Sequence, residues 1–285
     1  MSFSIVKRDG TREGLDIEKL HKVVEYACDN LAGVSVSEVE LKSHIQFYDK
    51  MTTKEIQETV IKAAADLISE ESPNYQFVAG RLICYDLRKE VFNKFEPPRL
   101  YKHVKRIIKK GFYEEELLNW YTEDEFDVMD SWIDHSRDET MTYAAMEQMR
   151  GKYLVKNRFD KKIYETPQIA FMLIAATLFH KYTDKRMMMV KDFYDALSRF
   201  DISLPTPVMA GVRTSVRQFS SCVLIETDDS LDSISATSAA IVRYVSKRAG
   251  IGIGAGRIRA LGSPINGGHA THTGTIPFFK HFQSA

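Results

Sequence analysis

The sequence predicts an α+β fold that gives way to an α/β arrangement toward the C-terminus, and three observations lead to this prediction. Two short strand-like runs flank an Asp9–Gly10 turn near the start. Helical apolar spacing then dominates as far as about residue 200. After Leu204, a strand-like run at 222–225 precedes another helical pattern. The predicted domains are residues 1–95, 96–200 and 201–285.

The composition is that of a globular chain. Its 285 residues are 44% hydrophobic and 27% charged, which suffices for two or three domains. The 39 acidic and 39 basic residues balance, which argues against nucleic-acid binding through a basic face. The 3 cysteines form no CxxC pair, and no secretory leader is present, so an exported disulfide-stapled protein is disfavoured. No apolar run is long enough to cross a bilayer, and we expect a soluble, cytoplasmic protein.

The first helix is predicted to begin after Asp16, because apolar residues recur at helical spacing from Ile17 to Leu31. Cys28 lies beside this apolar stripe, which indicates a role in core packing.

Capping boxes predict the next two helices. Ser37 with Glu40 indicates a second helix that runs through Tyr48, and Thr52 with Glu55 indicates a third.

The fourth helix is predicted to start at Ser72–Pro73, with proline at the first helical position, where no amide donor is lost. It is expected to end near Phe95. Glu96–Pro98 then gives the first domain boundary.

Cations gather around the first turn of the chain. They are Lys7, Arg8, Arg12 and Lys19, joined by Lys89 on the fourth helix. Such a cluster suits the several negative charges of a nucleoside triphosphate. On pattern alone, solvated lysines and arginines at element ends remain the simpler interpretation.

The middle region is predicted to be mainly helical. Leu100–Ile108 and Glu114–Trp120 have helical apolar spacing, and Thr122–Glu125 is a further capping box. Thr166–Pro167 opens a strongly apolar segment, Ile169–Phe179, that indicates a buried helix. Nothing in this region has metal-ligand spacing.

Val223–Ile225 is predicted to continue a buried strand. A cysteine in such a run, here Cys222, is most often a small buried hydrophobe. Asp229 or Ser230 is then predicted to cap a helix that runs to Arg248.

The run Gly250–Ala255 satisfies the G-x-G-x-x-A dinucleotide pattern. That pattern indicates a Rossmann site only between a strand and a helix. A helical segment precedes it and no long helix can follow it, so we expect the glycines to permit close approach of a ligand or a strand instead. His269 and His272 are three residues apart without further ligands, which favours solvated loop histidines over a metal site.

The sequence also resembles a known family. Five segments carry this resemblance: Leu204–Val208, Arg217–Glu226, Asp229–Asp232, Lys247–Gly254 and Arg257–Pro264. Together they resemble the large, catalytic subunit of aerobic (class I) ribonucleotide reductases of bacterial or bacteriophage type. The opening Val6–Gly10 and the four helices after it resemble an ATP-cone module. The implied fold is an ATP cone, a helical region and the first part of a ten-stranded α/β barrel.

The resemblance implies an oxidoreductase that reduces ribonucleoside diphosphates to deoxyribonucleoside diphosphates. Cys222 would be one of two redox-active cysteines, regenerated by an external dithiol of the thioredoxin or glutaredoxin type. Positions matching Thr206, Ser221 and Gly250 would contact the substrate. No metal is implied in this chain.

By the same resemblance, the second redox cysteine and the radical-carrying cysteine would lie beyond residue 285. The chain is therefore expected to need a polypeptide with the C-terminal part of the large subunit, and a radical-generating small subunit. A dimer of large subunits is also expected. Thr275–Pro277 predicts a final helix whose aromatic residues need a partner surface, so the isolated chain is expected to be inactive and to associate.

The resemblance implies two effector sites for ATP or deoxynucleoside triphosphates. The specificity site would use Asp229, Ser230, Leu231, Arg259 and Asn266, with Asp229 accepting a hydrogen bond from the deoxyribose hydroxyl. The ATP cone would use Lys7, Glu13, Lys19, Thr53 and Lys89.

The chain departs from the bacterial pattern at three places. Gln57 and Asp86 stand where histidines are expected, which predicts weak dATP inhibition because a carboxylate repels a polyphosphate. Asn266 stands where a second arginine is expected, so one phosphate contact is missing.

The alternative function is a non-catalytic, nucleotide-sensing regulator built on an ATP cone. Such a regulator should carry a zinc ribbon with paired CxxC motifs and a basic surface, and this sequence has neither. A truncation product that only binds nucleotides is a further possibility.

Overall fold

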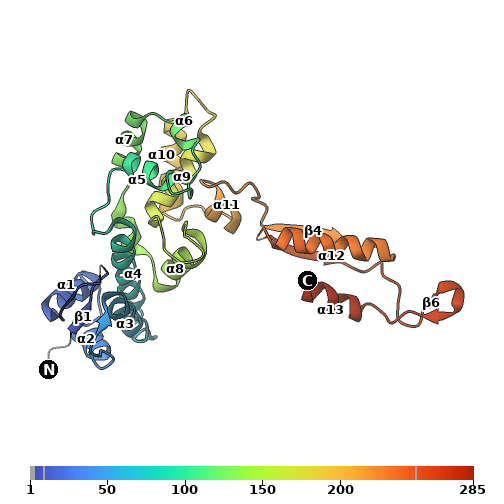
Figure 1. Ribbon diagram of the computed structural model, residues 1–285, viewed down its shortest axis with the longest axis horizontal. Helices are drawn as coiled ribbons and strands as arrows, with labels where there is room; N and C mark the ends of the chain where they lie inside the picture. Colours follow the sequence, from blue (N-terminus) through green and yellow to red (C-terminus); the bar gives the residue numbers. More distant parts are fainter. Residues whose placement is uncertain (1–3, 9, 248) are drawn as a thin grey trace. The chain divides into compact units, whose positions relative to one another are not determined.

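The computed structural model describes residues 4–8, 10–247 and 249–285 (Figure 1). Asp9 in the predicted turn and Arg248 at the predicted helix end lie outside the described residues. The chain divides into two compact units. The first is Met1–Ser203 with Arg213–Ser215, and the second is Leu204–Val212 with Val216–Ala285.

A small three-stranded sheet opens the first unit. Strand β1 (Ser4–Val6) pairs antiparallel with β2 (Arg12–Gly14), which confirms the predicted hairpin. Strand β3 (Met51–Thr52) joins the other edge of β1 in parallel. Two residues are too few to show strand periodicity, so β3 could not be predicted from the sequence.

Helices α1–α4 pack around this sheet. They are α1 (Ile17–Cys28), α2 (Val36–His44), α3 (Thr53–Ala65) and α4 (Tyr75–Phe92). Asp16 caps α1 as predicted, by accepting a hydrogen bond from the Lys19 amide. The Thr52–Glu55 capping box of α3 is also confirmed.

The predicted start and end of α2 were wrong. Ser35, not Ser37, is its N-cap and accepts from the Glu38 amide. Both serines have a glutamate three residues on, but neither glutamate returns to a cap: Glu38 accepts from the Tyr75 hydroxyl and Glu40 bonds to His21. The helix ends at His44, before Tyr48.

Helix α4 differs from its prediction at both ends. Pro73 lies in a turn before the helix, and Asn74 occupies the N-cap position without a side-chain cap bond. Asn93, with φ 60°, ends the helix in the left-handed conformation. Because α4 packs on α1 and α3 and also on α8, the predicted boundary after residue 95 stays a prediction.

The remainder of the first unit is helical, as predicted. Its elements are α5 (Leu100–Ile108), α6 (Leu117–Trp120), α7 (Glu123–Trp132), η1 (His135–Thr140), α8 (Tyr143–Gln148), the π-helical η2 (Met149–Tyr153), α9 (Pro167–Phe179) and α10 (Arg186–Ser198). The Thr122–Glu125 capping box starts α7, and Pro167 opens the buried helix α9; both were predicted.

A buried ion pair lies in the first unit and was not foreseen. Arg213 and Glu165 have fully buried side chains and pair with each other. The Tyr113 hydroxyl donates to Glu165 Oε2 at 2.7 Å, and the Val155 amide donates to Oε1 at 2.6 Å. These donors satisfy the carboxylate, as a buried charge requires.

The second unit contains a β-α-β arrangement (Figure 1). Its elements are α11 (Thr206–Gly211), β4 (Cys222–Glu226), α12 (Leu231–Val245), β5 (Gly250–Gly254), β6 (Pro264–Ile265), η3 (Asn266–Gly268), β7 (Ala270–Thr271) and α13 (Ile276–Ser284). Strands β4 and β5 are parallel, and α12 connects them. This is the repeating unit from which α/β barrels are built.

Helix α13 begins where Thr275–Pro277 predicted it, but its aromatic face already has a partner. Phe282 is 5% exposed and packs in one cluster with Ile234 and Ile241 of α12. Phe279 remains 48% exposed. The expectation that this face needs an external surface was therefore wrong for Phe282.

Strand β4 is not the buried strand that was predicted. Cys222 is exposed, and Leu224 is 87% exposed. In the described part of the chain β4 pairs only with β5, so alternate side chains of β4 face away from the core. No described helix is long and apolar enough to cross a membrane.

Candidate functional site

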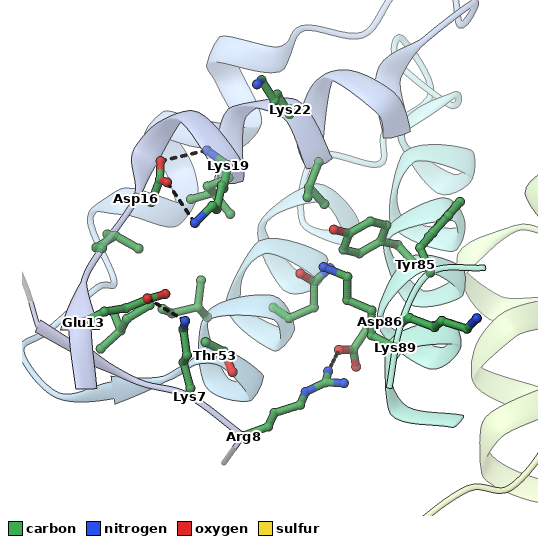
Figure 2. Close-up of a pocket in the computed structure, with 18 of the residues that line it drawn as sticks. Lys7, Arg8, Glu13, Asp16, Lys19, Lys22, Thr53, Tyr85, Asp86 and Lys89 are labelled. Carbon is green, nitrogen blue, oxygen red and sulfur yellow. Dashed lines mark hydrogen bonds and ion pairs between the residues drawn. The ribbon is translucent and has the colours of Figure 1, made fainter. Parts of the chain in front are cut away.

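A cavity of about 1250 Å³ lies between the β1–β2 hairpin and helices α1, α3 and α4 (Figure 2). We call it the cone pocket. All five predicted cone residues line it: Lys7, Glu13, Lys19, Thr53 and Lys89. The structure thus brings together side chains from four separate segments, while their contacts with a nucleotide stay a prediction. Arg12, which the sequence grouped with these cations, is not among the lining residues.

The cone pocket carries a surplus of positive charge. Among the described residues, six cationic and three acidic side chains line it. Each acid pairs with one cation: Lys7 with Glu13 at 2.6 Å, Lys19 with Asp16 at 3.2 Å, and Arg8 with Asp86 at 2.5 Å. The other cations are Lys22, Lys89 and Lys94. Such a surplus favours a polyphosphate ligand.

Asp86 does not stand as the bare carboxylate that the sequence suggested. Arg8 pairs with it from the residues after β1. Burial raises the pKa of Asp86, and the Arg8 guanidinium opposes that rise. Gln57 is 9% exposed and donates from Nε2 to the Leu82 carbonyl at 3.2 Å.

Three aromatic rings of the cone pocket were not predicted from the sequence: Tyr26, Tyr85 and Phe95. The ring centroids of Tyr85 and Phe95 are 5.4 Å apart. Lys89 Nζ lies 4.5 Å from the Tyr85 ring centroid. Flat rings beside cations can hold a nucleobase next to its phosphates. The position of Tyr85, one helical turn before Lys89, was the available sequence signal.

The predicted specificity residues gather at the start of α12. Ser230 is the N-cap, which decides between Asp229 and Ser230, and it accepts from the Ser233 amide at 3.1 Å. Arg259 holds the Asp229 carboxylate through Nε at 2.7 Å and through its own amide at 3.2 Å. These bonds lower the pKa of Asp229. Leu231 is 78% exposed at the first helical position.

Asn266 lies near Arg259 along the chain. Arg259 Nη1 donates to the Pro264 carbonyl at 3.2 Å, which ties it to β6, and Asn266 follows β6 directly. Arg259 already engages the Asp229 side chain, and the hydrogen bond from a deoxyribose hydroxyl to Asp229 stays a prediction.

The two loop histidines differ from each other. His269 is exposed as predicted. His272 is half-buried, stacks on Phe278 with centroids 5.6 Å apart, and accepts from the Gly274 amide. Its proximity also contributes to the lowered pKa of Asp229. The solvated interpretation was therefore wrong for His272. No group of potential metal ligands occurs among the described residues.

Three of the predicted redox and substrate residues, Ser221, Cys222 and Gly250, meet at the start of the parallel pair. Cys222 and Gly250 are register partners in β4 and β5. The Gly250 amide donates to the Ser221 carbonyl at 2.7 Å. Thr206 begins α11 in the same compact unit, and within the described part of the chain no hydrogen bond joins it to Ser221 or Cys222.

The glycine run is a strand rather than a phosphate loop. A Cβ on Gly252 would lie 2.6 Å from Leu224 Cδ2, and one on Gly254 would lie 2.5 Å from Glu226 Oε1. The glycines therefore allow the side chains of β4 to lie across β5, in agreement with the close strand approach expected from the sequence. No helix follows β5 directly, so the Rossmann interpretation fails.

Three protein-family models match the chain. The ATP cone domain matches residues 3–90, the all-alpha domain of ribonucleotide reductase matches residues 139–217, and the ribonucleotide reductase barrel domain matches residues 220–285.

The chain is also similar to curated alpha subunits of ribonucleoside-diphosphate reductase. The chain is 59% identical over 282 residues to ribonucleoside-diphosphate reductase 1 subunit alpha of Escherichia coli, covering 99% of this chain and 37% of that protein. It is 59% identical to the alpha subunit of Haemophilus influenzae, covering 100% and 38%, and 48% identical to that of Enterobacteria phage T4, covering 99% and 37%. The chain belongs to the family of ribonucleotide reductase alpha subunits. It spans less than two fifths of the length of these relatives.

Proposed function

We propose that this chain supplies the ATP cone, the helical domain and the first barrel strands of an enzyme that reduces ribonucleoside diphosphates to deoxyribonucleoside diphosphates. The observation that carries the proposal is the pairing of β4 with β5. It sets the exposed Cys222 thiol beside Gly250 and Ser221, at the start of a parallel β-α-β unit. A thiol that serves a substrate must be accessible, unlike the buried Cys28 and Cys84.

The proposed reaction balances with two thiols. The ribose 2′-hydroxyl leaves as water and hydrogen takes its place. Cys222 and a second cysteine give up two electrons and two protons, and a disulfide forms between them. An external dithiol of the thioredoxin or glutaredoxin class then reduces that disulfide. Ser221 and Thr206 would donate hydroxyl hydrogen bonds to the substrate without adding charge.

Two regulatory sites form part of the proposal. The cone pocket would bind ATP or a deoxynucleoside triphosphate, since cations and aromatic rings line it together. The start of α12 would bind the specificity effector, because free helix N-terminal amides and Arg259 both favour anions.

The proposed partners are those that the family resemblance implies. They are a ribonucleoside diphosphate, a polypeptide with the rest of the barrel, a radical-generating small subunit and a second large subunit. A cytoplasmic location belongs to the same proposal. The alternative, a non-catalytic nucleotide sensor, does not account for the matches to the all-alpha and barrel domains.

The test is deoxynucleotide formation by this chain mixed with the remaining alpha-subunit polypeptide and the small subunit. We expect turnover with an external dithiol, and we expect Cys222→Ser to abolish multiple turnover while nucleotide binding persists. Cys28→Ala is the control, because that cysteine is buried in α1 and lies in the other compact unit. Normal multiple turnover by Cys222→Ser would refute the assigned redox role.

A further inference from the structure

One ion pair of the cone pocket differs from the other two in burial. The lysine pairs, Lys7–Glu13 and Lys19–Asp16, have all four side chains at least 37% exposed. In the third pair the Asp86 side chain is only 6% exposed, and it holds Arg8 Nη2 at 2.5 Å (Figure 2). Exposed pairs contribute little and exchange readily, whereas separating a buried pair leaves an uncompensated charge.

Asp86 also lines a second cavity, of about 210 Å³, beside α3, α4 and η2. Charged or polar groups line the two cavities around Asp86. They are Glu90 on α4, Lys54, Gln57 and Glu58 on α3, Arg150 on η2, Lys156 and Lys161 after η2, and Lys7 and Arg8 after β1. Glu58 and Glu90 repel the carboxylate. Asp86 therefore depends on nearby cations for compensation.

Two other cations near Asp86, Arg150 and Lys156, are engaged by different partners. Arg150 donates to Glu58 at 2.9 Å and to Glu147 at 2.6 Å. Lys156 donates to the carbonyls of Arg150 and Gly151. Within the described part of the chain, the ion pair that Asp86 forms is the one with Arg8.

Arg8 is also the one arginine among the described residues that line the cone pocket. Its side chain is 41% exposed and points from the residues after β1 toward α4 (Figure 2). A guanidinium binds phosphate in the same bidentate manner as it binds carboxylate. Arg8 reaches Asp86 through Nη2. A polyphosphate that binds the guanidinium through this Nη2 therefore takes the donor from Asp86 and leaves that carboxylate facing Glu58 and Glu90.

We propose that Asp86 competes with the phosphates of the bound nucleotide for Arg8, and that this competition sets the affinity of the cone pocket for triphosphates. The inference rests on the proposed nucleotide-binding function of the cone. Asp86 is a positioning residue here, because it acts through Arg8 and touches no nucleotide.

The competition for Arg8 also predicts that Asp86 gains protons when the nucleotide binds. Burial raises the pKa of Asp86 and Arg8 opposes the rise, so removing Arg8 raises that pKa further. ATP binding therefore takes up protons at a pH between two values: the pKa of Asp86 while it is paired with Arg8, and the pKa of Asp86 once Arg8 has left it. Affinity for ATP should rise as the pH falls through that window, because a protonated Asp86 no longer holds Arg8.

The experiment is calorimetric titration of the whole chain with ATP. We expect Asp86→Asn, which is nearly isosteric, to bind ATP roughly tenfold more tightly, the effect of one released charge-assisted contact. Arg8→Gln alone should change the affinity for ATP by less than about threefold. The variant loses the phosphate contact of Arg8, but ATP binding no longer has to break the Arg8–Asp86 pair, and the two effects offset each other. In the Asp86→Asn background, Arg8→Gln should cost about tenfold. Asp66→Asn, on an exposed residue outside both cavities, is the control.

The outcomes separate this inference from the proposed function. ATP binding of equal strength in wild type and Asp86→Asn would overturn the competition and leave the nucleotide site standing. If Asp86→Asn still strengthened ATP binding in the Arg8→Gln background, Asp86 would act by repelling the phosphates directly. That result would also overturn the competition. Absence of binding in every variant would overturn both. Proton uptake, measured in buffers of different ionisation enthalpy, needs only the wild-type chain, and it should be present there and absent in Arg8→Gln.

Discussion

At the scale of single residues, Asp229 and Arg259 combine two tasks. Their pair fastens the loop that carries Arg259 to the start of α12, and both residues lie where the specificity effector is proposed to bind. A neighbouring pair offers a matched comparison. Asp228 pairs with Arg257 at 2.8 Å, but there the side chains are 63% and 67% exposed.

We predict that Asp229→Ala and Arg259→Ala each weaken the effector ten- to a hundredfold, because one charge-assisted contact is worth roughly 1.5–3 kcal/mol. Basal turnover should change less. The measurement is the shift of substrate preference with effector concentration in the assembled enzyme. Asp228→Ala is the control and should leave the curves unchanged, because its pair is exposed. Unaltered curves for both Asp229→Ala and Arg259→Ala would mean that the site lies elsewhere.

Asp138 gives a pH-dependent prediction in the helical domain. It is 1% exposed, and Gln168 Nε2 donates to it at 2.8 Å. Burial raises its pKa to about 7. Since the folded pKa lies above the unfolded value of 3.8, the native state binds the extra proton, and stability falls as the pH rises between these values.

Asp138→Asn should therefore stabilise the protein by on the order of 2 kcal/mol at pH 8 and by less near pH 5. Thermal unfolding at the two pH values measures this. Asp134→Asn is the opposite control: hydrogen bonds from Ser136 lower the pKa of Asp134, so this change should lower stability at neutral pH. A gain from Asp138→Asn that did not depend on pH would contradict the assignment.

At the scale of elements, α4 owes its position to one glycine. A Cβ on Gly80 would lie 2.1 Å from the Met141 carbonyl oxygen, a backbone atom that cannot move aside cheaply. The absence of a side chain lets α4 pack closely against the segment that leads into α8.

We predict that Gly80→Ala destabilises the protein by about 1–3 kcal/mol, although alanine favours helices by about 1 kcal/mol. The free energy of unfolding in urea measures this. Gly151→Ala is the matched control, because a Cβ there would have nothing within 4 Å, and it should be neutral or slightly stabilising. Equal effects of the two substitutions would show that α4 can shift to make room.

Capping-box patterns in the sequence predicted the helices whose two capping residues lie three positions apart. Thr52–Glu55 and Thr122–Glu125 marked the starts of α3 and α7. The same signal failed for α2, because Ser35 and Ser37 both offer it. Distant contacts surround both: the Tyr75 hydroxyl accepts from the Ser35 amide and donates to Glu38, and His21 pairs with Glu40. Sequence spacing alone contains no record of these contacts.

The candidate sites likewise contain some features that were predicted from the sequence and others that were not. Family resemblance, rather than spacing, predicted which residues line the cone pocket, and the structure brings them together. The Arg8–Asp86 pair joins residues 78 positions apart, and no local pattern indicates it. The exposure of Cys222 and Leu224 was missed because an apolar strand-like run indicates burial whether or not a neighbouring strand covers it.

At the scale of the whole molecule, the cone pocket and the specificity site lie in different compact units. Under the proposed function each site would bind a nucleotide, and the two nucleotides would differ in what they do to the assembled enzyme. Occupancy of the specificity site would change substrate preference, and occupancy of the cone would change overall activity.

We predict weak inhibition of the assembled enzyme by dATP at concentrations that saturate the specificity site. The reason is that Asp86 holds the cone arginine and adds a negative charge to the cone pocket, so the cone should bind dATP less tightly than the specificity site does. Deoxynucleotide formation at fixed substrate and rising dATP measures this. Asp86→His should strengthen inhibition, because a neutral imidazole holds Arg8 less strongly than a carboxylate does. A second, strongly inhibitory phase in the wild-type enzyme would contradict the prediction, as would an Asp86→His enzyme with the same dATP curve as the wild type.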